Sequence, residues 1–245
     1  MQFYLGTHMV NWLGLVDVPL FVSHRRLRDR KKLPRAIGPW ALDSGGFTEL
    51  AMYGGWQTPV DEYVEAVHRY QREIGSLAWA SPMDWMSEPA MLQRTGLSVR
   101  EHQERTVQNY LDLRGRGPFV PVLQGWTLND YERCVDLYAS AGVDVLAQPF
   151  VAIGSVCRRQ SRAEIGQIMA GLQPIRMHAF GVKTAGISAY GHLLASSDSL
   201  AWSYRARRSP RLPGCTHRGK CTNCLRFALR WRQKIIDIID RPRLF

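Results

Sequence analysis

Three aspartates in this sequence lie at the ends of short apolar runs or among small residues, where a carboxylate can do acid–base or nucleophilic chemistry. Asp43 ends the run Trp-Ala-Leu-Asp, Asp84 ends Ala-Ser-Pro-Met-Asp, and Asp198 lies in Ser-Ser-Asp-Ser. A single acid at such a position usually caps a helix or a turn. Two carboxylates in one pocket suit glycosidic chemistry, because one can attack the anomeric carbon while the other moves a proton at the leaving group.

Aromatic rings, an amide and glycines accompany these acids at the ends of other apolar runs. They are Phe47, Gln124, Gly125, Gly154, Phe180 and Gly181. Each acid taken alone is explained by a cap, but six such ends together describe a pocket with bare backbone for a planar ligand. Phe47 and Phe180 are predicted to stack on a flat heterocycle, and Asp84 and Gln124 to bind its polar edge. Cys157 and the region around Ser155 are predicted to line the same pocket.

Three of the five cysteines fall within ten residues that also hold a histidine, in Cys215-Thr-His217-Arg-Gly-Lys-Cys221-Thr-Asn-Cys224. This spacing predicts a closed structural zinc site with these four ligands. A loop of free thiols is the alternative, and a redox pair is disfavoured because such short spacings strain a disulfide. Cys134 and Cys157 stand apart and are predicted to be packed thiols.

The chain is strongly basic, with 32 Lys and Arg against 21 Asp and Glu and a net charge of +11. Two runs concentrate the cations. They comprise Arg25, Arg26, Arg28, Arg30, Lys31, Lys32 and Arg35, and then Arg205, Arg207, Arg208, Arg211, Arg218 and Lys220. A basic surface of this kind is typical of proteins that bind a polyanion. Arg205, Arg207 and Arg208 are predicted to hold nucleic-acid phosphates; a solvated basic loop is the alternative.

Apolar runs alternate with amphipathic runs along the chain. The expected strands are 3–6, 20–23, 40–43, 77–84, 119–125, 145–154, 177–182 and 199–204, and the expected helices are 60–74, 99–113, 128–141, 163–172 and 225–240. Thr58, Ser98 and Thr127 are the expected helix caps. Alternation of this kind predicts a parallel sheet, and eight strands predict an α/β fold of the (β/α)8 TIM-barrel type. A doubly wound open sheet is the alternative.

The composition changes near Ser209 toward Pro, Gly, Cys and Arg. Residues 1–208 are therefore predicted to form the barrel. Residues 209–245 are predicted to form a small zinc-binding appendage and a C-terminal helix, packed on the barrel. Hydrophobic residues make up 45% of the chain and charged residues 22%, which is a globular balance. No apolar run approaches the ~20 residues of a membrane span, and the N-terminus lacks a signal-peptide pattern. A cytoplasmic protein without membrane contact is expected.

The order of these motifs resembles the tRNA-guanine transglycosylase superfamily over nearly the whole chain. Asp43-Ser-Gly-Gly-Phe47 is the most specific element. Asp84, Gln124-Gly125, Ile153-Gly154, Phe180-Gly181-Val182, Asp198-Ser199 and the Cys/His cluster follow in the family's order. The short chain, the opening Leu5-Gly-Thr-His8 and the tryptophan-rich segments are most similar to the DpdA branch, whose members place 7-deazaguanines in DNA in phages and bacterial modification systems.

The resemblance implies a role for each motif residue. Asp198 would be the nucleophile at the sugar C1′ and Asp43 the general acid and base at the purine. Base recognition would fall to Asp84, Gln124 and the backbone of Gly154, with Gly125 and Gly181 beside them and Phe47 and Phe180 stacking on the ring. The implied partners are DNA, a free 7-deazaguanine such as 7-cyano-7-deazaguanine, and helper proteins of a modification system. The implied cofactor is a structural Zn²⁺.

The sequence departs from the tRNA enzymes in its length, in the residues after Asp198 and in its metal motif. Ser-Leu-Ala-Trp-Ser-Tyr-Arg follows Asp198 where the bacterial tRNA enzymes have Pro-Thr-Arg, and His217 stands in for a more distant family histidine. Two alternatives remain. One is a transglycosylase that acts on tRNA, and the other is a zinc-containing nucleic-acid-binding subunit without catalysis.

Overall fold

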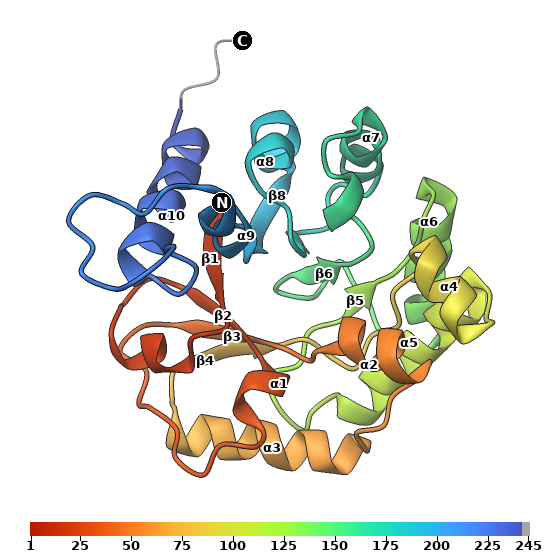
Figure 1. The fold of residues 1–245 in the computed structure, drawn as a ribbon. Helices are drawn as coiled ribbons and strands as arrows, with labels where there is room; N and C mark the ends of the chain where they lie inside the picture. The colour runs from red at the N-terminus through yellow and green to blue at the C-terminus, as the bar shows by residue number, and fades with distance from the viewer. Residues whose placement is uncertain (242–245) are drawn as a thin grey trace.

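Eight parallel strands form one curled sheet in a computed structural model that describes residues 1–241 (Figure 1). The strands are β1 (Gln2–Thr7), β2 (Leu20–Ser23), β3 (Trp40–Asp43), β4 (Leu77–Ala80), β5 (Val122–Leu123), β6 (Val151–Ile153), β7 (Met177–Ala179) and β8 (Leu194–Ser199). Their order is β4-β3-β2-β1-β8-β7-β6-β5, so the first strand pairs with the last. This order agrees with the strand sequence of a barrel and not with the reversal of a doubly wound sheet.

The sheet is a curled half-barrel. One isolated parallel bridge joins Ala80 of the end strand β4 to Phe119, which lies in the segment that leads into the other end strand, β5. The bridge is supported by two backbone hydrogen bonds, from Ala80 N to Pro118 O and from Val120 N to Ala80 O. The predicted α/β fold with eight parallel strands is thus confirmed at this level.

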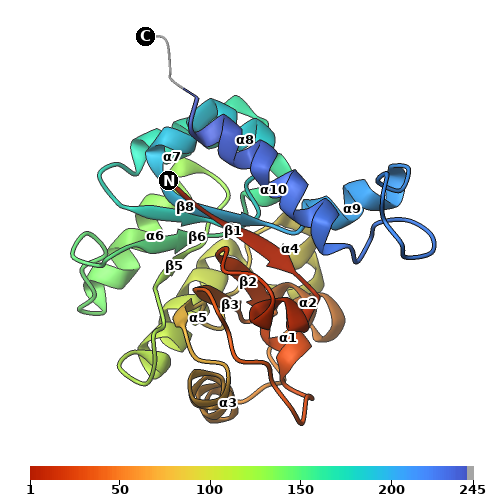
Figure 2. The ribbon, with the colours of Figure 1, turned by 90° about the vertical axis from the view of Figure 1, so that its left-hand side faces the viewer.

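Helices follow the strands and surround the sheet (Figures 1 and 2). They are α1 (His24–Leu27), α2 (Gly46–Tyr53), α3 (Val60–Glu73), α4 (Pro89–Thr95), α5 (Val99–Leu113), α6 (Leu128–Ser140), α7 (Ala163–Gly171), α8 (Thr184–Tyr190), α9 (Ala201–Arg208) and α10 (Leu225–Ile239), with 3₁₀ turns at Val10–Gly14, Cys157–Arg159 and Gly191–Leu193. The five expected helices are present as α3, α5, α6, α7 and α10.

Helix capping is partly as predicted. Ser98 and Thr127 each form a capping box with the acid three residues later, at the starts of α5 and α6. Thr58 does not cap α3. Pro59 occupies the cap position there, with extended backbone and no side-chain bond, and the helix begins at Val60.

The prediction of a strand over 199–204 is wrong. The eighth strand is β8, five residues earlier, and most of the predicted segment lies in α9. The physical reason is a four-residue spacing: Trp202 and Ala206 are both fully buried, which is one face of a helix. The expected strands 77–84, 119–125, 145–154 and 177–182 are shorter in the structure, at Leu77–Ala80, Val122–Leu123, Val151–Ile153 and Met177–Ala179. Three of them end early because the next residue, Ser81, Gly154 or Phe180, leaves the sheet to line a pocket.

Helix α10 packs against α8, α9 and β1. Its Trp231 ring lies 6.0 Å from the Phe3 ring of β1, and its buried residues share the main hydrophobic core with the strands. The segment between α9 and α10 projects from the body of the molecule as a loop (Figure 2). The last four residues of the predicted appendage, 242–245, lie outside the described residues.

Candidate active site and metal centre

The interior of the curled sheet is filled by an aromatic layer. Tyr4, Phe21 and Trp79 form one buried cluster, and the His178 ring lies 4.6 Å from the ring of Trp79. Successive side chains alternate between the faces of a strand, so the next inward residue lies two positions further on. Two positions after Tyr4, Phe21, Ala41, Trp79, His178 and Ser196 come, in that order, Gly6, Ser23, Asp43, Ser81, Phe180 and Asp198. All six of these later residues line one pocket.

This pocket has a volume of about 320 Å³ and lies at the carboxyl ends of the strands. Active sites occupy this edge in parallel α/β barrels. Of the residues predicted from sequence, it brings together Asp43, Phe47, Asp84, Gly154, Phe180, Gly181 and Asp198. Gln124 and Gly125 do not line it. Gln124 is buried beneath the pocket, and Gly125 packs closely against Asp130 and Tyr131.

Asp198 is held by one of its two carboxylate oxygens. Its Oδ1 accepts a hydrogen bond from the Gly181 backbone N–H at 2.9 Å, and His178 Nε2 lies 3.4 Å from the same atom. Gly181 has φ of +68°, a conformation that favours glycine and turns its N–H toward the carboxylate. Among the described residues, Oδ2 has no hydrogen-bond partner, so the second oxygen is available to react.

His178 was not predicted to belong to the site. It is fully buried in β7, and its Nδ1 pairs with Ser196 Oγ of β8 at 2.8 Å. That contact orients the imidazole so that its Nε2 faces Asp198; this buried nitrogen forms no hydrogen bond among the described residues. A histidine inside the apolar run Met177–Ala179 was the available signal.

Asp43 ends β3 and lies half-buried at the pocket wall. Burial raises the pKa of this carboxyl, and the negative charge of Asp198 raises it further, while bonds from the Gly45 N–H and the Ser23 hydroxyl oppose the shift. The Gly45 N–H bond to Oδ1 is 3.2 Å long. A carboxyl with a raised pKa is suited to give and take a proton.

Asp84 is buried, and its Oδ2 accepts a hydrogen bond from Gln124 Nε2 at 2.6 Å. Burial, together with the charge of Asp43, raises the pKa of Asp84 to about 7. Gln124 in turn needs glycine at position 154, since a Cβ there would lie 2.2 Å from its Nε2. Gln124 therefore acts on the pocket through Asp84 and the bare backbone of Gly154.

Glu88 is a fourth carboxylate of the pocket, and it was not predicted from the sequence. It is buried, and burial raises its pKa. The Ser155 hydroxyl lies 3.1 Å from Glu88 Oε2 and 2.8 Å from Gln124 Oε1. Because the Gln124 amide also donates to Asp84, it connects Glu88 and Asp84. Ser155 has φ of +59°, an unusual conformation for serine that is held by the bond from the Ser87 N–H. Glu88 directly precedes Pro89, the first residue of α4, and so occupies the N-cap position of that helix.

The two phenylalanines line different parts of the pocket. Phe180 packs against the aromatic layer, and Phe47 is 42% exposed at the start of α2. The Arg158 guanidinium lies 4.9 Å from the centre of the Phe47 ring. Cys157, which is half-buried, also lines the pocket, and burial raises the pKa of its thiol. Cys134 is fully buried in α6, as predicted.

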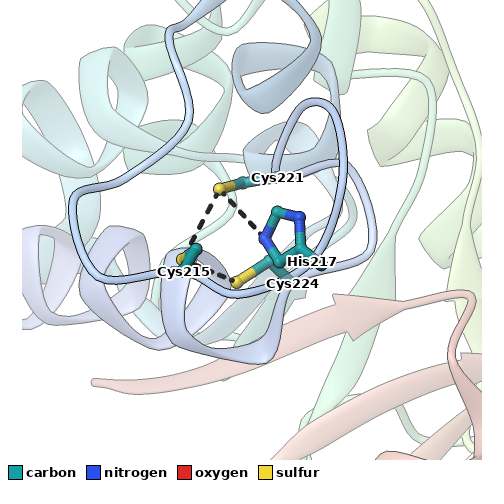
Figure 3. A group of neighbouring side chains, drawn as sticks. All are labelled: Cys215, His217, Cys221 and Cys224. Atoms are coloured by element: carbon teal, nitrogen blue, oxygen red, sulfur yellow. Dashed lines mark hydrogen bonds between the residues drawn. The ribbon is translucent and has the colours of Figure 1, made fainter.

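The predicted metal ligands come together in the loop between α9 and α10 (Figure 3). The ligand atoms of Cys215, His217, Cys221 and Cys224 all lie within 4.8 Å of one another. Cys215 Sγ is 3.8 Å from Cys224 Sγ and 4.0 Å from Cys221 Sγ, and Cys221 Sγ is 3.5 Å from His217 Nε2. Sulfur atoms around a tetrahedral zinc with bonds of about 2.3 Å are about 3.8 Å apart. The donor set and its spacing fit a metal ion.

We expect one zinc per chain in gently purified protein, measured by elemental analysis. Replacing the fully buried Cys221 by alanine should remove the metal, because three ligands hold zinc poorly. The melting temperature should fall, because the loop between α9 and α10 then loses the metal that holds it together. Cys134→Ala is the control, since it removes a cysteine outside the cluster and should keep the zinc. Full zinc retention in both Cys221→Ala and His217→Ala would contradict this ligand set.

Helix α9 connects the pocket to the metal loop. Leu200, at its start, lines the pocket, while Arg205, Arg207 and Arg208 are exposed along it. The guanidinium of Arg208 lies 3.6 Å from the centre of the exposed Tyr204 ring. The first basic run is partly used within the fold: Arg25 pairs with the buried Glu49 at 2.7 Å, and Arg35 donates to Arg72 O at the end of α3.

A sequence profile of the family described as DpdA, DeoxyPurine in DNA protein A, matches residues 1–244. The chain belongs to the DpdA family. Membership supports, at the level of the family, a transglycosylase of DNA modification. The sequence resemblance to the DpdA branch is thereby confirmed.

The solved structures that are similar to this chain include two of oxaloacetate acetylhydrolase. One, in complex with the product oxalate, shares 12% identity at a TM-score of 0.48 and covers 97% of this chain and 92% of that chain. The other, with the inhibitor 3,3-difluorooxalacetate, shares 13% identity at a TM-score of 0.47 and covers 100% and 94%. At this identity the reaction of those proteins does not transfer to this chain. No curated protein matches the chain. Within residues 1–241, none of the helices is long and apolar enough to span a membrane.

Proposed function

We propose that this DpdA-family protein exchanges guanine in DNA for a 7-deazaguanine base, such as 7-cyano-7-deazaguanine, through a covalent aspartyl–sugar intermediate. The observation that carries the proposal is one pocket lined by Asp43, Asp84 and Asp198 together with Phe47 and Phe180. In this proposal, residues 1–208 form a complete (β/α)8 barrel, and residues 209–245 form the zinc-binding subdomain with the C-terminal helix.

In the first step, Asp198 Oδ2 attacks C1′ of the deoxyribose. The bond from C1′ to guanine N9 breaks, its electron pair goes to the purine, and Asp43 supplies the proton that neutralises the leaving base. Asp198 suits this role because its other oxygen is fixed by the Gly181 N–H. The raised pKa of Asp43 suits proton donation.

In the second step, the 7-deazaguanine takes the place of guanine and its N9 attacks C1′. Asp43 accepts the proton from N9, and the ester to Asp198 breaks. Two inversions at C1′ retain the configuration of the nucleoside. The zinc ion, held by its four protein ligands, takes a structural part and leaves the chemistry to the carboxylates.

Asp84 and the Gly154 backbone read the edge of the base, with Gln124 acting from beneath. An ionised Asp84 accepts hydrogen bonds from the N1–H and the amino group of guanine, and Phe47 and Phe180 stack on the ring. Ser155 and Cys157 face the 7-substituent in this arrangement.

The affinity for free guanine is expected to rise about tenfold from about pH 6 to about pH 8. The pKa of Asp84 is raised to about 7, so its ionised, accepting form becomes dominant only as the pH passes that value. Asp84→Asn should bind guanine at least about tenfold more weakly at the higher pH, because an amide presents a donor to donors. It should also lose the pH dependence; calorimetric titration measures both.

Two neighbouring carboxyls, Asp43 and Glu88, also have raised pKa values and face this pocket. Glu88→Gln is the matched control, since it removes a buried carboxyl and keeps an oxygen for the Ser155 hydroxyl. It should retain the rise in affinity with pH. The same rise in Asp84→Asn would contradict the assignment of Asp84 to base recognition.

DNA is the proposed polymer substrate, and a guanine within a duplex has to be flipped out to reach the pocket. A depression that shares Cys157 and Gly181 with the pocket is lined by Arg158, Lys183 and Ser199, which suits the phosphates beside the flipped nucleotide. Arg205, Arg207 and Arg208 continue this positive surface along α9. Helper proteins of a modification system and a cytoplasmic setting in bacteria or phage-infected cells belong to the same proposal.

Exchange of radiolabelled guanine into DNA and into tRNA, assayed side by side, tests this function. We expect incorporation into DNA only, followed by displacement of the label by an unlabelled 7-deazaguanine. Incorporation into tRNA alone would favour the tRNA alternative, because the pocket residues could act on guanine attached to either deoxyribose or ribose. Absence of exchange with retained nucleic-acid binding would favour a non-catalytic subunit.

A further inference from the structure

A second cleft lies away from the catalytic pocket, where α9, the metal loop and α10 meet. Its volume is about 300 Å³. Four cations line it, two of them, Arg205 and Arg211, from α9 and the loop, and two, Arg230 and Lys234, from α10. The remaining lining residues are Ser209, Pro210, Leu212, Pro213, Phe227 and Trp231, so no acid lines the cleft.

The cations of this cleft are not used by the fold as salt bridges. None of the four pairs with an acid among residues 1–241, and all four are exposed. Arg211 is oriented by its bond to His217 O at 2.9 Å. The acid next along α10, Asp237, accepts instead from Gln233 at 2.9 Å.

Arg230 and Lys234 are four residues apart on α10 and so lie on one face of the helix. Like charges at this spacing destabilise a helix. Helix stability therefore does not explain the pair. The cleft has instead the composition of a site for an anionic ligand, with a floor of mostly buried Phe227 and Trp231.

Helix α9 runs from the catalytic pocket to this cleft, so its length gives the approximate distance between them. Leu200 lines the pocket, Ala201 lines the depression beside it, and Arg205 and Ser209 line the cleft. The eight residues of α9 span about 12 Å. One strand of B-form DNA covers that distance in about four nucleotide steps. A strand that leaves the pocket along α9 therefore reaches the cleft.

We propose that this cleft is a phosphate-binding subsite for the DNA strand that carries the target guanine, about four nucleotides from it. The inference rests on the proposed function and adds to it a place where the flanking backbone is held. Lining by cations without any acid suits phosphodiesters, which carry no sequence information, so this contact fixes register and strengthens binding for any flanking sequence.

The test compares Arg230→Ala/Lys234→Ala with Arg72→Ala/Arg176→Ala. The control pair removes two exposed cations that precede β4 and β7, at the opposite edge of the sheet. Equilibrium binding is measured over a range of salt concentrations with a long duplex and with a short one. The short duplex keeps about two base pairs on each side of the guanine and is closed at one end by an uncharged linker, which holds its strands together. The salt dependence of binding falls by about 0.9 in log–log slope for each phosphate that the protein no longer neutralises.

On the long duplex, the cleft variant should show a slope smaller by about 1.8 and bind about tenfold or more weakly at moderate salt. The control pair should match the wild-type protein, and the short duplex should not distinguish the three proteins. An unchanged slope on the long duplex, or an equal decrease on the short one, would overturn the proposal. Phosphate binding in a direct titration with inorganic phosphate, without any effect on the DNA slope, would identify a free-anion site instead.

The binding measurements separate this proposal from the proposed function. Salt slopes require no catalysis, so they test the cleft even if no guanine is exchanged. Conversely, the cleft variant should exchange guanine in the short duplex at the wild-type rate, because its substitutions are remote from the pocket. Normal guanine exchange together with unchanged salt slopes would contradict the proposed phosphate subsite and leave the proposed function in place.

Discussion

Replacing Asp198 by alanine is expected to abolish guanine exchange, because no other carboxylate of the pocket is fixed in the same way toward C1′. Its Oδ1 is bound by the Gly181 N–H and approached by His178, and its Oδ2 is left to react. Asp198→Asn should be equally inactive, since an amide is a poor nucleophile. The asparagine keeps an oxygen for the Gly181 N–H, so folding and guanine binding should be retained.

Trapping the intermediate measures this expectation directly. Wild-type protein with guanine-containing DNA should give an adduct that survives denaturation, with a mass that maps to the peptide holding Asp198. The asparagine variant should bind the same DNA and give no adduct. An adduct on the peptide of Asp43 would reverse the two proposed roles, and normal exchange by Asp198→Ala would remove the mechanism.

Much of the sheet could be predicted because its strands are short apolar runs that end in a polar residue. The segment Trp40–Asp43 is such a run, and it forms β3 with the expected bounds. The last strand lacked this signal. Its sequence Leu-Ala-Ser-Ser-Asp-Ser is mostly polar, yet its serines are buried. Ser196 pairs with His178 of β7, and Ser197 donates to Val182 O, just beyond β7. Burial of hydroxyls by partners across the sheet is not visible in the sequence.

The candidate site divides in the same way. Residues at strand ends could be predicted to meet, since parallel strands end at one edge, and Asp43, Asp84 and Asp198 do line one pocket. Depth could not be predicted. Gln124 lies one layer below the pocket and acts through Asp84, while Glu88, which was not predicted from the sequence, lines the pocket. Whether a side chain reaches the pocket or stays beneath it depends on packing. Gln124, for example, stays beneath the pocket and packs against Gly154, where a Cβ would lie 2.2 Å from its Nε2.

Asp43→Asn is expected to slow exchange by about 10²–10⁴-fold while leaving the nucleophile in place. Asp43 is the carboxyl to which we assign the proton for the departing purine, and an amide cannot supply that proton. The asparagine oxygen still accepts from the Gly45 N–H, so the turn that begins α2 is preserved. Single-turnover formation of the Asp198 adduct is the measurement that reports this step.

A change of leaving group distinguishes a defect in proton transfer from a damaged fold. DNA carrying N7-methylguanine already has a cationic purine, which departs as a neutral base without a proton from the enzyme. With this substrate, Asp43→Asn should form the Asp198 adduct at close to the wild-type rate, whereas Asp198→Asn should remain inactive. If the defect of Asp43→Asn were equally large with both substrates, the role of Asp43 would be structural, through the turn at Gly45, and not that of the acid. Rescue confined to Asp43→Asn is expected because only that variant lacks the proton and keeps the carboxylate that attacks C1′.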